Sequence, residues 1–268
     1  MRRIKGLVIN RGLIGSFHGI NSKFRLLDSE ESYDENLKTQ PLDWEYRTTK
    51  LNYQYNEYGH RSMAPSELPD DYILFTGCSI TEGVGMAQEY MYSDIVAKHL
   101  NKPYYNLAVG GSGIDLLVQN LIAFLSFNKK PSKVIIQWPD TSRFYHIEHD
   151  LAMHLMNSSC REDPDHAELW KYFTINNIAL DKNILHRIYG LTVLNNMQIN
   201  DIYEIFSETG YRNNEQDIIR LMDCSGLPFN TNRILFDYHS GLDYARDLLH
   251  PGSKSNMIYA QRIIEVLK

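Results

Sequence analysis

Short apolar runs alternate along the chain with longer segments in which apolar residues recur at helical spacing. The run at 72–76 ends at Gly77 and predicts a buried parallel strand, and the segment 77–83 predicts the turn that leaves the carboxyl end of this strand. Further strands are predicted at 103–109, 134–138 and 233–238, and helices at 88–100, after Gly113 and at 253–267. This alternation predicts a doubly wound, mainly parallel sheet with right-handed crossovers.

The segment 164–224 has a mainly helical pattern and belongs to an insertion at about 145–232. It may be a cap over a site, a layer of the core or a dimer contact, and the sequence leaves these open. The pattern predicts one long apolar face made of Ile184, Leu185, Ile188, Leu191, Leu194, Met197, Ile202, Ile205 and Phe206. The closing helix is predicted to turn Met257, Ala260, Ile263 and Ile264 inward.

Tyrosines are frequent between Trp44 and Gly59. Tyr46, Tyr53, Tyr55 and Tyr58 predict an edge strand or hairpin packed on the main sheet. A surface that stacks on sugar rings is the alternative interpretation.

The length and charge place limits on the class of protein. With 268 residues, we expect one domain with an N-terminal extension at about 1–68. The 27 basic and 33 acidic residues give a net charge of −6, which argues against nucleic acid and anionic membranes as partners. No apolar stretch approaches the roughly 18 residues of a membrane span.

The N-terminus and the cysteines predict a cytoplasmic protein. The basic start resembles a signal peptide, but Asn10 and Arg11 interrupt it before an apolar core forms, although export by another route stays open. Cys78, Cys160 and Cys224 are too widely spaced for a zinc motif or a disulfide framework, which fits a reducing compartment.

Two short segments contain candidate chemistry. Ser79 follows the strand at 72–76, where a parallel sheet presents side chains to a crevice, although a turn serine that only satisfies backbone groups is the alternative. Asp247 lies three residues before His250, and Pro251 extends the backbone of His250, so a helical turn would end there with both side chains on one side. The carboxylate could then orient the imidazole to take a proton from Ser79. A capping Asp and a terminal helix His are the alternative.

The order of these segments resembles the SGNH (GDSL-like) hydrolase family over residues of about 71 to 268. The resemblance rests on Gly-x-Ser-x-Thr-x-Gly at 77–83, the glycine-rich block at 106–113 and Asp-x-x-His-Pro-Gly at 247–252. Residues 55–62 also resemble the Asn-x-x-Gly-x-Arg segment of many members. The resemblance implies a three-layer α/β/α sandwich with a flavodoxin-like sheet. It further implies a catalytic Ser79, Asp247 and His250, an oxyanion hole formed by the N–H groups of Ser79 and Gly111, and no cofactor or metal.

Two positions depart from the family pattern. The family has Gly-x-Asn-Asp where this chain has 137–140, so Pro139 replaces an asparagine that donates to the oxyanion. Loss of one such donor costs about 100- to 1000-fold in rate unless another group replaces it, and the sequence does not choose among Gln137, Thr141, Ser142 and Arg143. Cys78 stands where the family usually has aspartate, and we expect it to be buried rather than nucleophilic.

Histidines gather after the third predicted strand. His146 and His149 would share a helix face near Asp150, with His154 beyond them, and such a set could bind a metal. The spacing matches metallohydrolase patterns poorly, so histidines at the rim of the site are the preferred interpretation.

The sequence therefore predicts a serine esterase that removes a small acyl group, with acetyl favoured, from a small-molecule or carbohydrate ester. An O-acyltransferase with the same triad and a non-catalytic binding module with the same fold are the alternatives. The acyl acceptor and the oligomeric state stay open.

Overall fold

The computed structural model describes residues 8–10, 13–16, 21–25, 27–139, 143–147, 153–156, 171–172, 178–207, 231–236 and 242–268. Its centre is a five-stranded sheet in the order β11-β10-β7-β5-β6, in which all neighbouring strands are parallel. The strands are β5 (Ile73–Thr76), β6 (Tyr104–Asn106), β7 (Lys133–Gln137), β10 (Ile202–Ser207) and β11 (Thr231–Phe236). This is the flavodoxin-like order, so the predicted fold class is confirmed, and the strand order reverses beside β5 and β7.

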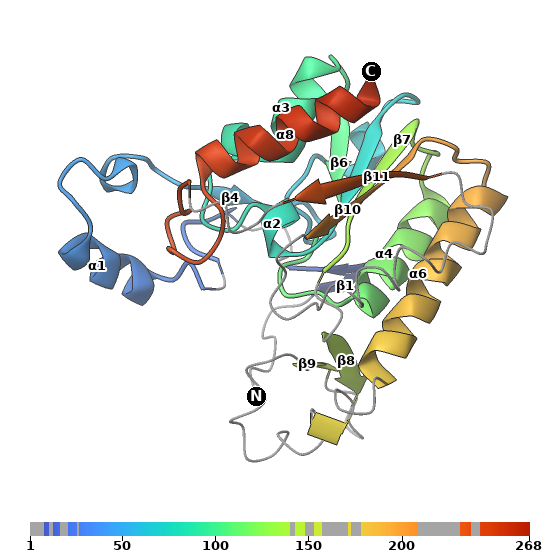
Figure 1. The fold of residues 1–268 in the computed structure, drawn as a ribbon, viewed down its shortest axis with the longest axis horizontal. Coiled ribbons are helices and arrows are strands. Elements are labelled where there is room, and N and C mark those ends of the chain that lie inside the picture. Colours follow the sequence, from blue (N-terminus) through green and yellow to red (C-terminus); the bar gives the residue numbers. More distant parts are fainter. Residues whose placement is uncertain are drawn as a thin grey trace.

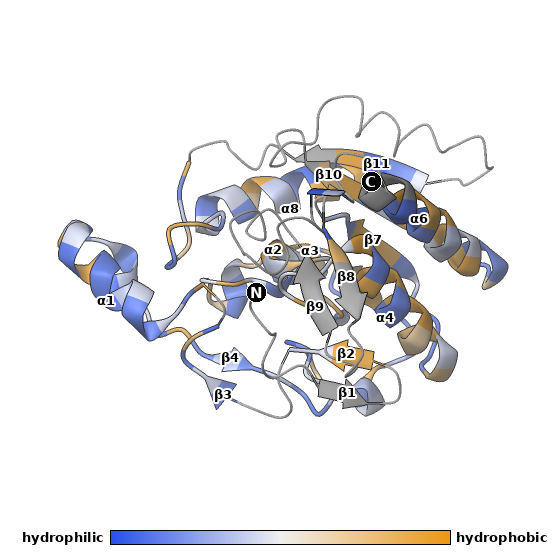
Figure 2. Cartoon of the chain, turned by 90° about the horizontal axis from the view of Figure 1, so that it is seen from below, coloured by the Kyte–Doolittle hydropathy of each residue, from blue (hydrophilic) through white to orange (hydrophobic). Residues whose placement is uncertain are grey.

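Helices cover both faces of the sheet and make three layers (Figure 1). Helices α3 (Tyr92–His99) and α8 (Ser253–Leu267) lie on one face, and α4 (Ile114–Phe127) and α6 (Ile178–Asn196) on the other. The alternation of side chains along each strand explains both cores, because Ile73 and Phe75 pack with α3 and α8 whereas Leu74 packs with α4 and α6. Figure 2 shows the apolar residues concentrated on β7 and β10 and in stripes along these helices.

Smaller elements surround the sandwich. Helix α1 (Glu30–Thr39) buries none of its residues and projects away from the sheet (Figures 1 and 2). Three antiparallel pairs are formed by β1 (Val8–Asn10) with β2 (Leu13–Gly15), β3 (Asn21–Ser22) with β4 (Tyr53–Gln54), and β8 (Phe144–Ile147) with β9 (Met153–Met156). The remaining elements are the short helix α2 (Ser79–Glu82) and the 3₁₀ turns Glu45–Arg47, Pro65–Glu67 and Gln88–Tyr90.

The predicted helical face at 184–206 is wrong in its second half and also at Leu185, which is 65% exposed on α6. Helix α6 ends at Asn196, and Ile202, Ile205 and Phe206 belong to strand β10. Strand β10 is an interior strand of a sheet that helices cover on both sides, so both of its faces are buried and its sequence carries no period-2 signal that would separate it from a helix. Within α6, Leu191 and Leu194 are fully buried in the core. Helix α6, which lies in the insertion, is therefore a layer of the core.

Two further expectations need correction. Met257 is 52% exposed, although it was predicted to face inward with Ala260 and Ile263, which are buried. The tyrosine-rich segment forms part of the small β3–β4 pair and does not join the main sheet. Because Tyr46, Tyr53 and Tyr55 are buried, these rings cannot stack on a sugar at the surface.

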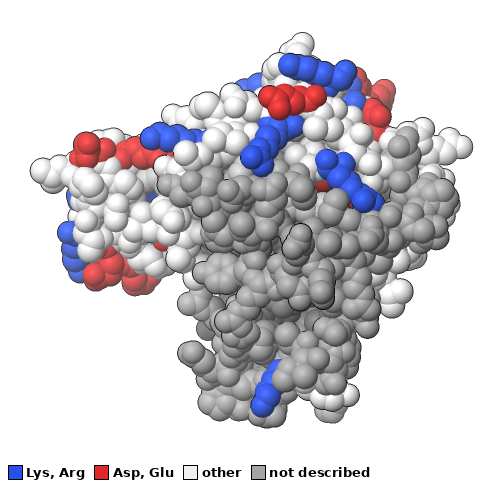
Figure 3. Space-filling model, viewed as in Figure 1, with Lys and Arg blue, Asp and Glu red and all other residues white. Residues whose placement is uncertain are grey.

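The surface charge is mixed in sign. Acidic and basic side chains lie interspersed over the described part of the face in Figure 3. None of the helices in the described ranges combines the length and the apolar composition that crossing a bilayer requires.

His60 makes the stability of the fold sensitive to pH. Its ring is fully buried, with Nδ1 2.8 Å from Tyr105 Oη and Nε2 3.3 Å from the carbonyl oxygen of Ile14. Burial lowers the pKa of His60 to about 4 from an ordinary value of 6.5. The unfolded chain thus binds more protons between these two values, and stability falls as the pH drops through that window.

We expect His60→Gln to reduce the loss of unfolding free energy between pH 7 and pH 5 by about 2 kcal/mol relative to wild type. Urea unfolding followed by circular dichroism at both pH values measures this difference. The comparison removes the contribution of other histidines, which both proteins share. Equal pH dependence in the two proteins would contradict a buried, neutral His60.

Candidate active site

Ser79, His250 and Asp247 form a hydrogen-bonded chain. Ser79 Oγ lies 2.8 Å from His250 Nε2, and His250 Nδ1 lies 2.5 Å from Asp247 Oδ2. An ionised carboxylate can only accept, so Nδ1 carries the proton and Nε2 is left to accept from the serine hydroxyl. Ser79 is 8% and Asp247 5% exposed, whereas the His250 ring is partly open. The structure therefore brings together the three residues that the sequence proposed as a triad.

The turn that contains Asp247 and His250 is held by its own backbone. Asp247 Oδ1 accepts the N–H groups of Leu249 and His250, both at 3.0 Å, and the N–H of Ala245 donates to the carbonyl of His250 at 2.8 Å. The predicted helical turn is wrong. Leu248 adopts a left-handed φ of 57°, and the next helix, α8, starts only at Ser253. The spacing of Asp247 and His250 nevertheless places the two side chains in contact.

The surroundings of Asp247 favour its ionised form. Burial by itself would raise its pKa, but hydrogen bonds from the His250 ring and from the backbone N–H groups of His250 and Leu249 lower the pKa of Asp247 below its ordinary value. The carboxylate is therefore negative at neutral pH, which favours a positive charge on the neighbouring imidazole.

Ser79 is the first residue of α2, directly beyond the carboxyl end of β5. A Cβ on Gly77 would lie 2.1 Å from Thr81 Oγ1, so a glycine is required for the helix to fold back this closely. The carbonyl of Thr81 accepts from Asn106 Nδ2 at 2.7 Å, which fastens α2 to the end of β6. The N–H of Ser79, as the first in the helix, has no helical acceptor.

Glu82, at the end of α2, is a buried charge that organises the surrounding turns. Its carboxylate is 0% exposed and accepts from Arg25 Nε and Tyr55 Oη, both at 2.7 Å, and from the N–H of Gly110. Burial would raise the pKa of Glu82, but Arg25 and these hydrogen bonds lower it. Residues from the N-terminal segment thus hold the nucleophile helix and the glycine-rich turn together.

Arg61 satisfies the carbonyl groups that follow α2. Its NH1 donates to the carbonyl of Gly83 at 2.6 Å and its NH2 to that of Met86 at 2.9 Å, while the guanidinium lies 4.6 Å from the centre of the Tyr53 ring. Gly83 has a φ of 78° and ends the helix in the left-handed conformation. The Arg of the Asn-x-x-Gly-x-Arg segment therefore fixes the exit of the nucleophile helix.

The glycine-rich turn lies beside the nucleophile turn. The N–H of Val109 and the hydroxyl of Ser112 both donate to the carbonyl of Gly77, at 3.3 and 3.1 Å. Gly111 between them has a φ of 82°, a conformation that favours glycine. The turn that contains Gly111 is thereby fixed to a residue two positions before Ser79.

The four candidates for a further oxyanion donor are placed differently. Gln137 is buried, and its amide contacts Thr81 Oγ1 at 2.6 Å and Cys78 Sγ at 3.8 Å. Arg143 is half-buried, and its carbonyl accepts from Asn183 Nδ2 at 2.9 Å and packs against Gly113, two residues from Gly111. Thr141 and Ser142 lie outside the described residues, as does Asp140.

Cys78 is buried as expected, and Cys160 and Cys224 are also outside the described ranges.

The predicted histidine helix is wrong, because Phe144–Ile147 is strand β8. His146 and His154 are register partners in the β8–β9 pair, while His149 and Asp150 lie outside the described residues. Strand pairing replaces the helical spacing that would have brought His146 and His149 to one face. No group of three or more histidine, cysteine or acidic side chains that could hold a metal occurs in the described part of the chain.

Sequence reasoning missed Glu82, Arg25, Asp28 and Arg246, which surround the site as buried ion pairs. Only Glu82 had a local signal, since an acidic residue stood next to the glycine that ends a short turn. The partners of the other three are far away in the chain, so no spacing rule could have identified them.

No protein-family model and no curated protein sequence matches this chain. Solved structures do match. An acetyl xylan esterase from the rumen bacterium Butyrivibrio proteoclasticus aligns with a TM-score of 0.50 and 16% identity over 74% of this chain. A family two carbohydrate esterase from Clostridium thermocellum, in complex with cellohexaose, aligns with a TM-score of 0.50 and 15% identity over 75% of this chain. This chain spans 63% and 65% of the lengths of those two chains.

At these identities the likeness concerns the fold. The chain has the α/β architecture of SGNH-like hydrolases, as its motif order predicted. The alignments do not test the roles of individual residues.

We expect Glu82→Gln to lower the free energy of unfolding by about 3–5 kcal/mol, because the buried Arg25 guanidinium loses the carboxylate with which it is paired. Urea unfolding at pH 7 measures the loss. Glu89→Gln removes the same charge from an exposed nearby position and should change stability by less than about 0.5 kcal/mol. Equal stability of both variants would contradict the organising role of Glu82.

Proposed function

We propose that this protein is a serine esterase that hydrolyses small acyl esters, with acetyl esters of carbohydrates as the substrate class. The observation that supports this most directly is the 2.8 Å contact of Ser79 Oγ with His250 Nε2, backed by Asp247 on the other ring nitrogen. This arrangement suits a nucleophile whose proton is removed as it attacks.

In the proposed first step, Ser79 Oγ attacks the ester carbonyl carbon while His250 Nε2 takes the hydroxyl proton. Asp247 stabilises the imidazolium that forms. The N–H groups of Ser79 and Gly111 donate hydrogen bonds to the negatively charged former carbonyl oxygen. Collapse of this intermediate breaks the ester C–O bond, and His250 gives its proton to the leaving alcohol, which leaves Ser79 acylated.

In the second step, His250 takes a proton from a water molecule that attacks the acyl carbon. The second tetrahedral intermediate collapses, the proton returns to Ser79 Oγ, and the carboxylic acid leaves. This cycle uses only groups from the chain and water. Because Pro139 stands where the family has an asparagine donor, the oxyanion is stabilised in this mechanism by the backbone N–H groups of Ser79 and Gly111.

The substrate class is supported by the structural neighbours. One solved neighbour is an acetyl xylan esterase and another is a carbohydrate esterase bound to cellohexaose. Both share the fold at low identity, so the acyl group and the sugar are the parts of this proposal that depend on experiment.

We expect purified protein to hydrolyse p-nitrophenyl acetate and acetylated xylo-oligosaccharides, and Ser79→Ala to lose at least about 1,000-fold in kcat. Mass spectrometry of the quenched reaction should show one acetyl group on the peptide that contains Ser79. Ser126→Ala, a change on the surface of α4, is the matched control and should retain full activity.

A Ser79→Ala variant that is folded and hydrolyses both substrates at the wild-type rate would rule out Ser79 as the nucleophile. Equal slow release by all three proteins would instead rule out an esterase for these substrates.

We also expect water to be the preferred acyl acceptor. Hydrolysis and transfer share the acyl-enzyme and differ only in what attacks it. With acetyl ester and a free xylo-oligosaccharide present together, chromatography should show more acetate than acetylated sugar. A product mixture dominated by acetylated sugar would identify an O-acyltransferase.

A further inference from the structure

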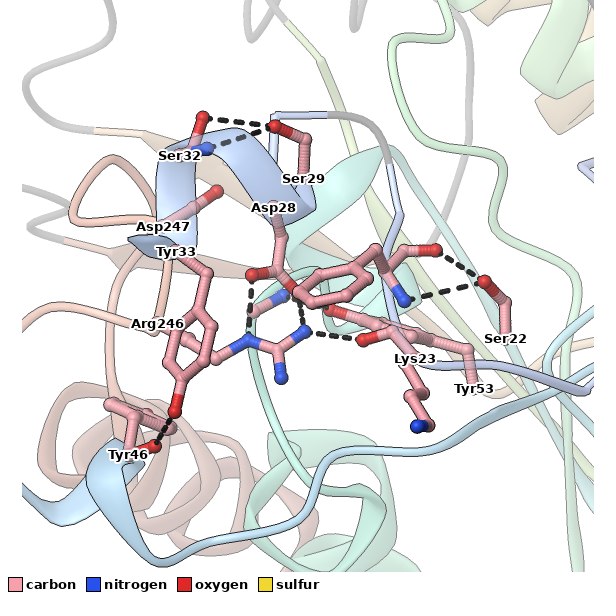
Figure 4. Close-up of polar contacts among 12 residues, drawn as sticks. Ser22, Lys23, Asp28, Ser29, Ser32, Tyr33, Tyr46, Tyr53, Arg246 and Asp247 are labelled. Atoms are coloured by element: carbon pink, nitrogen blue, oxygen red, sulfur yellow. Dashed lines mark hydrogen bonds and ion pairs between the residues drawn. The ribbon is translucent and has the colours of Figure 1, made fainter. Parts of the chain in front are cut away.

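Asp28 and Arg246 form a buried ion pair directly beside the proposed active site. Arg246 Nε lies 2.8 Å from Asp28 Oδ1, and Arg246 NH2 lies 2.7 Å from Asp28 Oδ2. Asp28 is 1% and Arg246 4% exposed, and the two residues are 218 positions apart in the chain. Arg246 immediately precedes Asp247, so the pair connects the N-terminal segment to the turn that holds the imidazole (Figure 4).

The Arg246 side chain is fixed on every side. Its guanidinium lies 4.7 Å from the centre of the Phe24 ring and 5.1 Å from that of Tyr33, and its NH2 also donates to the carbonyl of Lys23. The carbonyl of Arg246 accepts from Asn36 Nδ2 at 2.9 Å. A two-point contact with a carboxylate, together with two neighbouring aromatic rings that pack against the guanidinium, restricts the guanidinium to one orientation.

A closed ring of hydrogen bonds joins this pair to the nucleophile segment. The backbone N–H of Arg246 donates to the carbonyl of Gly85 at 3.0 Å, and the N–H of Gly85 donates to Tyr53 Oη at 2.6 Å. Tyr53 Oη in turn donates to Asp28 Oδ2 at 2.5 Å, and the contact of this oxygen with the Arg246 guanidinium closes the ring. Asp28 thus binds the Asp247 turn directly through Arg246 and the nucleophile segment through Tyr53, and the relative position of these two segments sets the distance from Ser79 to His250.

Gly85 shows how little space this junction has. It has a φ of 78°, and an added Cβ would lie 2.7 Å from Ala245 Cβ and 3.4 Å from Asp247 Oδ1. The nucleophile segment and the Asp247 turn therefore touch through backbone and small side chains. A displacement of Arg246 would move Asp247 relative to Ser79.

We propose that Asp28 is a positioning residue, which acts through Arg246 to hold the Asp247–His250 pair in register with Ser79. Its effect on catalysis rests on the proposed function, whereas its effect on the Asp247–His250 contact does not. Misplacement of catalytic groups by about 1 Å can cost about 100-fold in rate, so loss of Asp28 should lower kcat while substrate binding is kept.

The test compares Asp28→Asn with wild type and with Glu35→Gln. The asparagine keeps the shape of Asp28 but removes its charge, whereas Glu35 is an acidic residue on α1 whose partner, Lys38, is exposed. Three measurements are made: the steady-state kinetics (kcat and KM) on p-nitrophenyl acetate, the thermal midpoint of unfolding, and the low-field proton resonance of His250 Nδ1–H. The resonance is assigned by its absence in His250→Gln.

For Asp28→Asn we expect kcat to fall about 10- to 100-fold with KM changed less than about 2-fold, and the His250 resonance to shift or broaden. Glu35→Gln should match wild type in all three measurements. A folded Asp28→Asn with wild-type kcat and an unchanged resonance overturns the proposal, because a residue that only adds stability would alter the thermal midpoint alone.

A second variant covers the case in which Asp28→Asn does not fold. Arg246→Lys keeps the charge but loses the two-point contact, and it should show a smaller loss of kcat with the same change in the resonance. Wild-type values for both quantities in Arg246→Lys would likewise overturn the proposal. If wild type shows no esterase activity but its resonance is altered by Asp28→Asn, the positioning role stands and the proposed function fails.

Discussion

The site depends on one buried carboxylate, Glu82. It lies at the end of the helix that begins with Ser79, and no part of it reaches solvent. A charge in that position is tolerated only if its oxygens are matched by a cation and by hydrogen-bond donors. Arg25 supplies the cation, and Tyr55 and Gly110 supply donors. The requirement to compensate this charge therefore brings the N-terminal segment onto the nucleophile helix.

The N-terminal segment is accordingly part of the site's support. Arg25 forms an ion pair with Glu82 at the end of the nucleophile helix. Asp28, three residues later, forms an ion pair with Arg246 in the turn that contains Asp247 and His250. Buried ion pairs contribute little net stability compared with apolar side chains of the same size, but they strongly disfavour arrangements that leave a charge unmatched. In this chain such pairs join segments that are far apart in the sequence, and they fix the position of these segments relative to one another.

The sheet and the contact of Asp247 with His250 were predictable because each depends on local patterns. Short apolar runs that end near Gly77 and Pro139 located β5 and β7, and the three-residue spacing of Asp247 and His250 was sufficient to place their side chains together. The apolar run of β10 was misassigned, since a strand buried on both faces has no alternation to reveal it. Glu204 in that strand is compensated by Arg187 from α6, a pairing that only the fold creates. The ion pairs around the site escaped prediction for the same reason.

The replacement at Pro139 can be understood from how β7 ends. The N–H of Trp138 donates to the carbonyl of Ile205 at 3.0 Å, and its indole N–H donates to Glu204 at 2.8 Å, so this residue continues the sheet and is anchored towards α6. Pro139 then offers no backbone or side-chain donor. Under the proposed mechanism the oxyanion consequently depends on the turn at Gly111. The N–H of Gly110, the residue before it, donates to Glu82, so the carboxylate that fixes the nucleophile helix also fixes the turn proposed to receive the oxyanion.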